Sequence, residues 1–178
     1  SKDEWLSLVP ENVRNEKCGD VSYIMHWTKY PKDVHEYIKN IENIKSLYKG
    51  DTYELFLSNQ KKYKAEGPTV EEWINSIANC EMLYTDSFHG MCFAIIFNKQ
   101  FVLFDTSGDC FERCSSLMNL LGIKSRLAHT IEDIKRLNNN PIDYNVVNKK
   151  LAEQMAISEK FLDKILYSHN NFDKIRNY

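Results

Sequence analysis

The sequence predicts an α/β fold, a three-layer sandwich in which a mainly parallel sheet lies between two layers of helices. Three observations lead to this prediction. Short apolar runs alternate with amphipathic segments, the central connections are only a few residues long, and capping side chains stand before two of the amphipathic segments. Strands that alternate with helices form parallel sheets, because each helix carries the chain back across the sheet.

The composition fits one domain. The chain has 178 residues, of which 43% are apolar, and this is enough to bury one hydrophobic core. Lys and Arg number 23 against 25 Asp and Glu, a net charge of −2, which gives no general positive field for nucleic acid. No apolar stretch approaches the roughly 18 to 20 residues that a membrane span needs. We expect a cytoplasmic protein that binds no nucleic acid and has no transmembrane segment.

The five cysteines are an odd number without close-set pairs, which favours reduced thiols over a disulfide framework. Cys110 and Cys114 would share a helical face, and Cys92 follows His89 by one turn, but no C-x-x-C or H-x-x-x-H pair anchors a metal site. We expect buried free thiols, no metal and no cofactor. The first residue is serine rather than methionine, so we also expect an excised segment of a longer protein.

The first 20 residues are interpreted as a lead-in. Residues 21–27, VSYIMHW, form an apolar and aromatic run that predicts a buried strand. Beyond Pro31, apolar side chains at helical spacing predict a helix over residues 33–47; they are Val34, Tyr37, Ile38, Ile41 and Ile44. Residues 53–58 give a weaker prediction of a strand, followed by a polar loop.

The central segment gives the clearest alternation. Thr69 and Glu72 match a capping box, which predicts a helix that ends near Asn79. A strand is predicted next at residues 81–85, then a helix at residues 88–98 and a strand at residues 101–105. A helix over residues 110–121 follows, with Leu117, Leu120 and Leu121 facing inward and a stop at Gly122.

The last part of the chain is predicted to be helical. Thr130 caps a short helix that ends near Leu137, and a long helix runs from Asp143 to about Tyr167. We expect the stripe of Leu151, Phe161 and Ile165 to pack on the body. The predicted division is therefore a lead-in at residues 1–20, an α/β domain at residues 21–140, and a C-terminal helix with a frayed tail at residues 141–178.

Polar residues gather where the strand at residues 81–85 ends. In the sequence TDSFHG, Asp86 or Ser87 can cap the next helix, whose first turn holds Phe88, His89 and Gly90. Ligands of parallel sheets collect at the carboxyl ends of strands, where helix N-termini offer free N–H groups and partial positive charge. The cluster therefore suits a phosphate or a carboxylate. The alternative interpretation is an ordinary helix cap with a surface histidine.

Two segments resemble a known family. They are TVEEWINSIANCEMLYTDSFHGMCFAIIFNKQFVLF, residues 69–104, and ERCSSLMNLLGI, residues 112–123. Both are similar to the C-terminal half of the polysaccharide pyruvyl transferase family, whose members commonly show a strand ending in T-D-S-F-H-G and an Arg that heads a Leu-rich helix. Residues 142–166 also resemble the closing helix of that family. The resemblance covers about residues 21–166 and is strongest over residues 69–123.

The resemblance implies transfer of pyruvate from phosphoenolpyruvate to hydroxyls of a cell-surface polysaccharide sugar, as a ketal, with release of phosphate. It implies a GT-B-like pair of Rossmann-like domains, of which this chain is the C-terminal one. The partners would be the phosphoenolpyruvate donor, a sugar or lipid-linked oligosaccharide acceptor, and a missing N-terminal Rossmann-like half. Without that half, we expect this segment to be inactive.

The resemblance also implies a set of site residues, with His89 as the catalytic residue. The residues expected to bind substrate are Asp86, Ser87, Phe88, Gly90 and Arg113. The sequence departs from the family at Met91 and Cys92, where members often have Thr and a small or branched apolar residue.

The chemistry of these side chains fits the implied donor. Histidine is the side chain type that exchanges a proton near neutral pH, so His89 could move a proton or only bind phosphate. Arg113 offers a planar fork for a carboxylate or phosphate, and its alternative is a surface ion pair with Asp109 or Glu112. Asp86 would cap the helix or orient His89. His26, at the end of the first predicted strand, is a weaker second candidate.

Two other functions use the same edge of the sheet. A GT-B-like nucleotide-sugar glycosyltransferase domain would hold a diphosphate there, and a noncatalytic anion-binding domain would hold an anion without chemistry. Competition between phosphoenolpyruvate and nucleotide sugars would separate the three.

Overall fold

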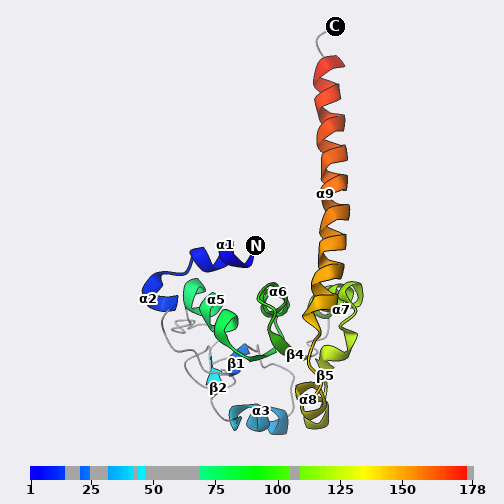
Figure 1. Ribbon diagram of the computed structural model, residues 1–178. Helices are drawn as coiled ribbons and strands as arrows, with labels where there is room; N and C mark the ends of the chain where they lie inside the picture. The colour runs from blue at the N-terminus through cyan, green and yellow to red at the C-terminus, as the bar shows by residue number, and fades with distance from the viewer. Residues whose placement is uncertain (15–20, 25–31, 42–43, 47–68, 105–108, 176–178) are drawn as a thin grey trace, which may run out of the picture.

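The computed structural model describes residues 1–14, 21–24, 32–41, 44–46, 69–104 and 109–175. Within them, five parallel strands form one sheet in the order β2-β1-β3-β4-β5 (Figure 1). The strands are β1 Val21–Ile24, β2 Ile44–Ser46, β3 Met82–Thr85, β4 Gln100–Phe104 and β5 Leu127–Ala128. The predicted α/β fold with a parallel sheet is therefore confirmed.

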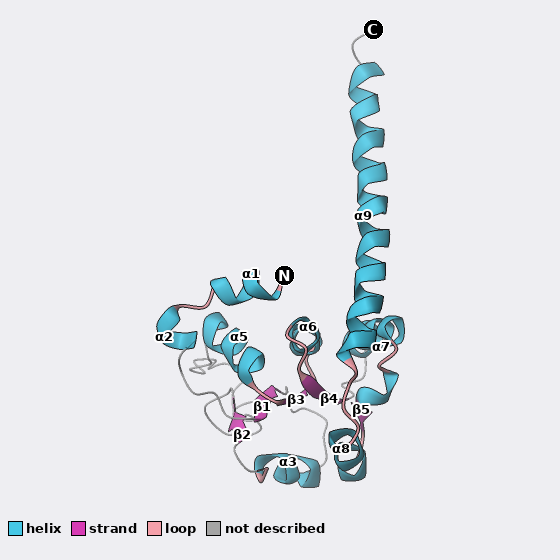
Figure 2. Cartoon of the chain, in the orientation of Figure 1, coloured by secondary structure: helices cyan, strands magenta, loops and turns pink. Residues whose placement is uncertain are grey.

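Helices cover both faces of this sheet, with α5, α6 and α7 on one side and α3 and α8 on the other (Figure 2). The described helices are α1 Lys2–Ser7, α2 Glu11–Arg14, α3 Lys32–Lys39, α5 Val70–Asn79, α6 Phe88–Ile96, α7 Asp109–Leu121, the 3-10 helix η1 Lys124–Arg126, α8 Ile131–Asn138 and α9 Tyr144–Ile175. The three layers follow the sequence pattern, because each apolar run is followed by an amphipathic segment.

The central strands supply apolar side chains to two separate cores. Successive side chains of a strand point to opposite faces, and Leu83 therefore joins the core under α5, α6 and α7, whereas Tyr84 joins the core over α3 and α8. In β4, Phe101 and Leu103 enter the first core, and Val102 and Phe104 enter the second. Residues 82–84 of β3 and 101–104 of β4 form unbroken apolar runs because both faces of these two strands are covered.

The register of the sheet determines where loops meet. Thr85 at the end of β3 pairs with Leu103 near the end of β4, so both strands present their carboxyl ends at the same edge. Helix α6 begins at Phe88, just beyond β3, and α7 begins at Asp109, beyond β4. The sheet thereby places the first turns of two helices at one edge, hereafter the carboxyl edge.

The predicted helix signals are confirmed. Thr69 and Thr130 each form a full capping box, with Glu72 and Asp133 as the reciprocal partners. Helix α7 stops at Gly122, which has a φ of 74°, a left-handed conformation that glycine adopts without a steric penalty.

One prediction in the first part of the chain needs correction, and two others lie outside the described residues. The helix after Pro31 ends at Lys39, and Ile44 begins strand β2 rather than continuing the helix. In β2 it pairs with Val21 of β1, so the pairing of strands outweighs the helical spacing. His26 and the strand predicted at residues 53–58 lie outside the described residues.

The lead-in contains two short helices that the sequence pattern did not predict. Helices α1 and α2 lie against α5, where the Asn75 side chain donates a hydrogen bond to the Val13 carbonyl at 2.7 Å. The rings of Trp5 and Phe93 meet edge to face with centroids 4.9 Å apart. These contacts attach the N-terminal segment to the same face of the sheet as α6.

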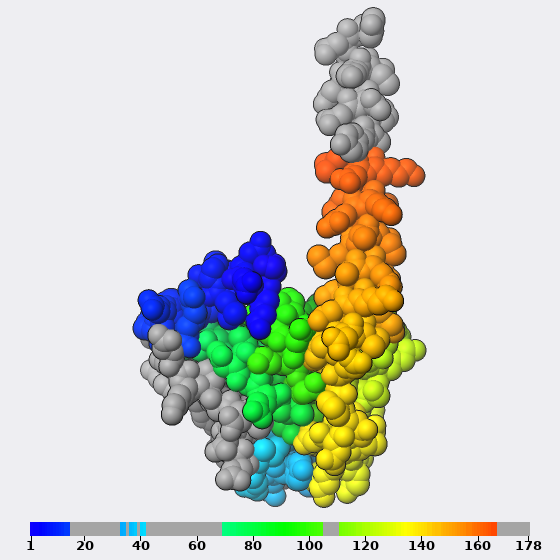
Figure 3. All heavy atoms as spheres, in the orientation of Figure 1, coloured from blue at the N-terminus to red at the C-terminus, as the bar shows by residue number. Residues whose placement is uncertain are grey.

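Helix α9 packs on the body only through its first turns. Val147 is buried and Leu151 is half-buried, whereas Phe161 is 62% and Ile165 is 39% exposed. The expected packing is therefore wrong for Phe161 and Ile165, and the helix extends away from the body between Leu151 and Leu166 (Figure 3). The helix also continues to Ile175, beyond its expected end.

A similar correction applies to α7. Leu121 is buried and Leu117 packs partly against the core, but Leu120 is 48% exposed and faces away. Among the helices described, none is both long enough and apolar enough to span a membrane.

Candidate functional site

The loop from β3 to α6 is held by two side-chain hydrogen bonds. The backbone N–H of Ser87 donates to Thr85 Oγ1 at 3.0 Å, and the backbone N–H of Gly90 donates to Ser87 Oγ at 3.2 Å. Ser87 is thus the N-cap of α6. Of the two residues expected to cap this helix, Ser87 has that role.

Gly90 is required by the close approach of α6 to β3. A Cβ atom at Gly90 would lie 2.7 Å from Thr85 Oγ1, which is shorter than a van der Waals contact allows. The small residue therefore lets the first turn of α6 lie directly on the end of the strand. This approach sets the position of the neighbouring residues Phe88 and His89.

We expect Gly90→Ala to lower the free energy of unfolding by about 1 to 2 kcal/mol, because the overpacked methyl group outweighs the higher helix propensity of alanine. Chemical denaturation followed by circular dichroism measures the change. In a Thr85→Ala background the clash is gone, and Gly90→Ala should then be neutral or stabilising. Equal losses in both backgrounds would show that the contact with Thr85 is not the reason for the glycine.

The residues of the cluster differ sharply in exposure. Asp86 is 2% exposed and Ser87 is 9% exposed, whereas the side chain of His89 is open to solvent. A dissolved ligand that reaches this edge therefore meets His89 before it meets the carboxylate of Asp86. The side chains of Ser87 and Thr85 are already engaged in the loop itself.

The ring of Phe88 connects His89 with Arg113 of helix α7. The Arg113 guanidinium carbon lies 5.1 Å from the Phe88 ring centroid, and the Phe88 and His89 ring centroids are 5.8 Å apart at an interplanar angle of 75°. Phe88 itself packs partly against the main core. The structure thus brings together three residues from the predicted site, and two of them, His89 and Arg113, are exposed.

The structure also contains a buried arginine that was not predicted from the sequence. Arg126 is only 2% exposed; its Nε donates to the Phe101 carbonyl at 2.7 Å, and Nη1 donates to the carbonyls of Leu137 and Asn140 at 3.0 and 2.7 Å. Burial lowers the pKa of Arg126 from 12.5 to about 10, so the group is still charged at neutral pH. Nothing in the sequence separates it from the exposed arginines.

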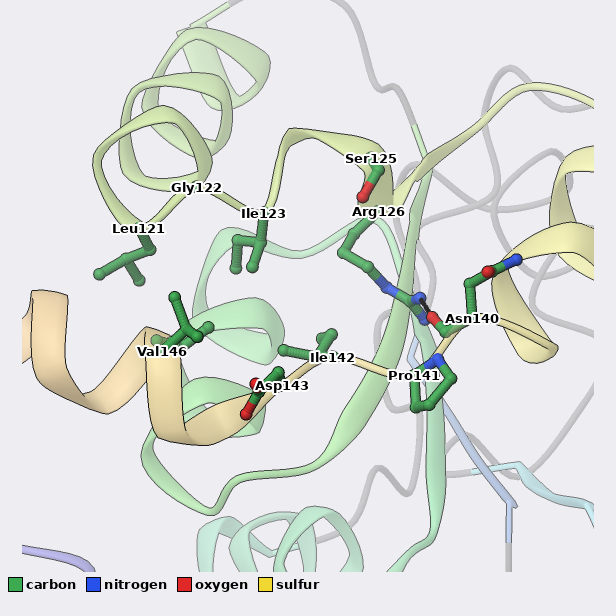
Figure 4. A pocket seen from close by; sticks show the side chains of 11 residues that line it. Leu121, Gly122, Ile123, Ser125, Arg126, Asn140, Pro141, Ile142, Asp143 and Val146 are labelled. Carbon is green, nitrogen blue, oxygen red and sulfur yellow. Dashed lines mark hydrogen bonds between the residues drawn. The ribbon is translucent and has the colours of Figure 1, made fainter.

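Arg126 also lines a cavity of about 260 Å³ between the end of α7 and the start of α9 (Figure 4). Phe101 lies near the beginning of β4, and Ile142 bonds to the side chain of Gln100, the first residue of that strand. The cavity therefore lies toward the edge opposite Thr85. Nη2 of Arg126 has no hydrogen-bond partner in the described part of the chain, but it is closed to solvent, so we interpret Arg126 as a structural clamp.

The described thiols agree in part with expectation. Cys80 and Cys114 are buried reduced thiols, and Cys92 is a half-buried one. Burial raises the pKa of the Cys92 thiol. In the described ranges, no three His, Cys, Asp or Glu side chains gather as they would around a metal ion.

Comparison with known proteins identifies the family. Residues 11–108, more than half of the chain, match the model of the family described as polysaccharide pyruvyl transferase. The chain belongs to the polysaccharide pyruvyl transferase family. No curated protein and no solved structure matches the chain significantly.

The matched residues place the cluster, but not all of the site, within the polysaccharide pyruvyl transferase region. Thr85, Asp86, Ser87, Phe88, His89 and Gly90 all lie inside it, whereas Arg113 lies beyond its end. Membership of the family makes the chain part of a transferase family. The roles of the individual residues remain predictions, and those predictions are now limited by the exposures and contacts given above.

Proposed function

We propose that the carboxyl edge of the sheet binds phosphoenolpyruvate and that the protein transfers its pyruvyl group to hydroxyls of a polysaccharide sugar as a ketal. The observation that supports this most directly is that His89 and Arg113 are both exposed and both contact the ring of Phe88, the first residue of α6. A guanidinium, an imidazole and the first N–H groups of a helix are all donors to anions. Phosphoenolpyruvate carries two anionic groups.

The proposed reaction requires two proton movements. One sugar hydroxyl oxygen adds to the central carbon of phosphoenolpyruvate, and the methylene carbon gains a proton and becomes a methyl group. A second hydroxyl oxygen forms the other C–O bond of the ketal as the bond to phosphate breaks. The two hydroxyl protons balance the methyl group and the released hydrogen phosphate. His89 is the proposed proton carrier at this edge.

Arg113 has a binding role in this proposal. Its planar guanidinium suits a bidentate contact with the carboxylate or the phosphate of the donor. Asp86, buried beneath the first turn of α6, has a supporting role rather than direct contact with the ligand, and Ser87 keeps the helix N-terminus in place. These assignments combine the resemblance of the motif with the exposure of each side chain.

We further propose that a second Rossmann-like half, in a GT-B-like arrangement, supplies the rest of the cleft. The described residues around Phe88 provide one guanidinium and one exposed imidazole, whereas donor and acceptor together present a phosphate, a carboxylate and several hydroxyls. Additional groups would hold the acceptor and exclude water, and a facing domain is the natural source of both.

We expect the 178-residue chain to bind phosphoenolpyruvate but to release no phosphate when acceptor sugars are added. Isothermal titration measures binding, with uridine diphosphate glucose as the competing ligand, and a phosphate assay measures turnover. Binding of the nucleotide sugar instead would favour a glycosyltransferase domain, and binding of neither would contradict a donor site. Robust phosphate release by this chain alone would contradict the need for a second half.

A further inference from the structure

We propose that Phe88 is a positioning residue, which holds the Arg113 guanidinium beside His89 at the anion site instead of contacting the ligand itself. This inference rests on the proposed function. It differs from the role that the family resemblance implies for Phe88, which is direct binding of substrate.

The position of Phe88 explains how it can fulfil this role. Its ring packs partly against the main core, and this packing fixes the orientation of the ring. The Arg113 guanidinium lies over this ring at 5.1 Å from the centroid, within the range of a cation–π contact. His89, the next residue along α6, meets the same ring edge to face at 5.8 Å. One anchored ring therefore contacts both exposed donors.

The contact matters because Arg113 is a long, exposed side chain on a different helix. A long side chain loses rotamer freedom when it binds a ligand, and this loss weakens binding. A guanidinium that already rests on an aromatic face is partly ordered before the ligand arrives. The close approach of α6 to β3 at Gly90 fixes the start of the helix that carries Phe88. The position of the Phe88 ring therefore depends on the packing of α6 against the sheet.

The first test needs no ligand. In the nuclear magnetic resonance spectrum, the ring current of Phe88 should shift the Arg113 side-chain Nε–H signal upfield. Phe88→Leu should abolish this shift, and Phe88→Tyr, which keeps the ring, should retain it. Phe93→Leu is the matched control, because Phe93 lies on the same helix but contacts Trp5 and Trp73. An Arg113 signal unchanged by Phe88→Leu, in a folded protein, would overturn the proposal.

The second test is a double-mutant cycle on phosphoenolpyruvate binding. We expect Arg113→Met to weaken binding about tenfold to a hundredfold and Phe88→Leu to weaken it about threefold. In the Arg113→Met background, Phe88→Leu should cause no further loss, because its effect acts through Arg113. The same threefold loss in both backgrounds would show that Phe88 contacts the ligand directly and would reject the positioning role.

The two tests also separate this inference from the proposed function. If the unmodified chain fails to bind phosphoenolpyruvate, the donor proposal fails. The ring-current test then still decides whether Phe88 holds Arg113, and titration with inorganic phosphate repeats the cycle. If Phe88→Leu does not fold, the Phe88→Tyr variant and the Arg113→Met variant carry the comparison, with Phe88→Tyr expected to bind as the unmodified chain does.

Discussion

In a protein that carries the proposed second half, His89→Ala should lower kcat by about a hundredfold to ten-thousandfold, the usual contribution of a general acid or base. The exposure of His89 at the first turn of α6 leaves its ring free to meet a bound substrate. Steady-state phosphate release with saturating phosphoenolpyruvate measures the change. Because His89 is exposed and Gly90 is retained, the variant should keep its fold, which circular dichroism verifies.

The control for His89 is His129, an exposed histidine beside the N-cap of α8. His129→Ala should leave kcat within about twofold of the unmodified enzyme. His129 follows β5 at the same edge, but β5 is two strands from β3, a separation of roughly 10 Å, which is too far for proton transfer to a substrate at His89. His89→Gln keeps a donor but cannot carry a proton near neutral pH. If His89→Gln retained full activity, His89 would be a phosphate ligand rather than a proton carrier.

The largest effect on stability should come from Arg126→Met, with a loss of about 3 kcal/mol in the free energy of unfolding. The carbonyls of Phe101 and Leu137 lose a buried hydrogen bond and that of Asn140 a partly buried one, and each buried acceptor left without a partner costs about 1 to 3 kcal/mol. Methionine recovers part of the loss through its similar length and apolar character. Equilibrium denaturation with urea measures the difference.

Arg136 provides a matched control for this variant. It lies on the same part of the chain but is exposed, and it pairs only at the surface with Asp133 at 2.8 Å. Exposed ion pairs contribute about 0 to 1 kcal/mol, so Arg136→Met should change stability by less than about 1 kcal/mol. Equal effects of the two substitutions would contradict the clamp role of Arg126.

The sequence predicted the central elements because several local signals agree there. The capping boxes at Thr69 and Thr130 mark helix starts by the hydrogen bonds that their side chains make, and the apolar runs of β3 and β4 are short and bounded. Local signals of this kind act within one turn or one strand. The position of TDSFHG at a strand end followed from the same reasoning, and the structure has that arrangement.

The wrong predictions concern segments whose structure depends on a distant part of the chain, which a local sequence pattern does not identify. The apolar spacing of residues 33–47 is compatible with one helix, but Ile44 pairs with Val21 as a strand. An apolar stripe likewise predicts a buried face without saying what covers it, and Phe161 and Ile165 of α9 proved exposed.

Contacts between distant elements were also beyond the reach of the sequence. Arg126 bonds to three carbonyls from β4, α8 and the segment that follows α8, and no spacing along the chain indicates such a meeting. The approach of Arg113 to Phe88 joins α7 to α6 in the same way. The sequence could therefore nominate side chains for the site, but it could not say which of them touch.

The projecting part of α9 should unfold independently of the rest of the molecule. Beyond Leu151, its large apolar side chains are exposed, and they include Met155, Ile157, Phe161, Leu162, Ile165 and Leu166. A helix that buries so little depends on its own backbone ladder, which is marginal in water. Its outer turns can therefore open and reclose without disturbing the sheet, as a separate folding unit. Amide hydrogens should exchange there orders of magnitude faster than in β3 and β4, within a protein whose core is still intact.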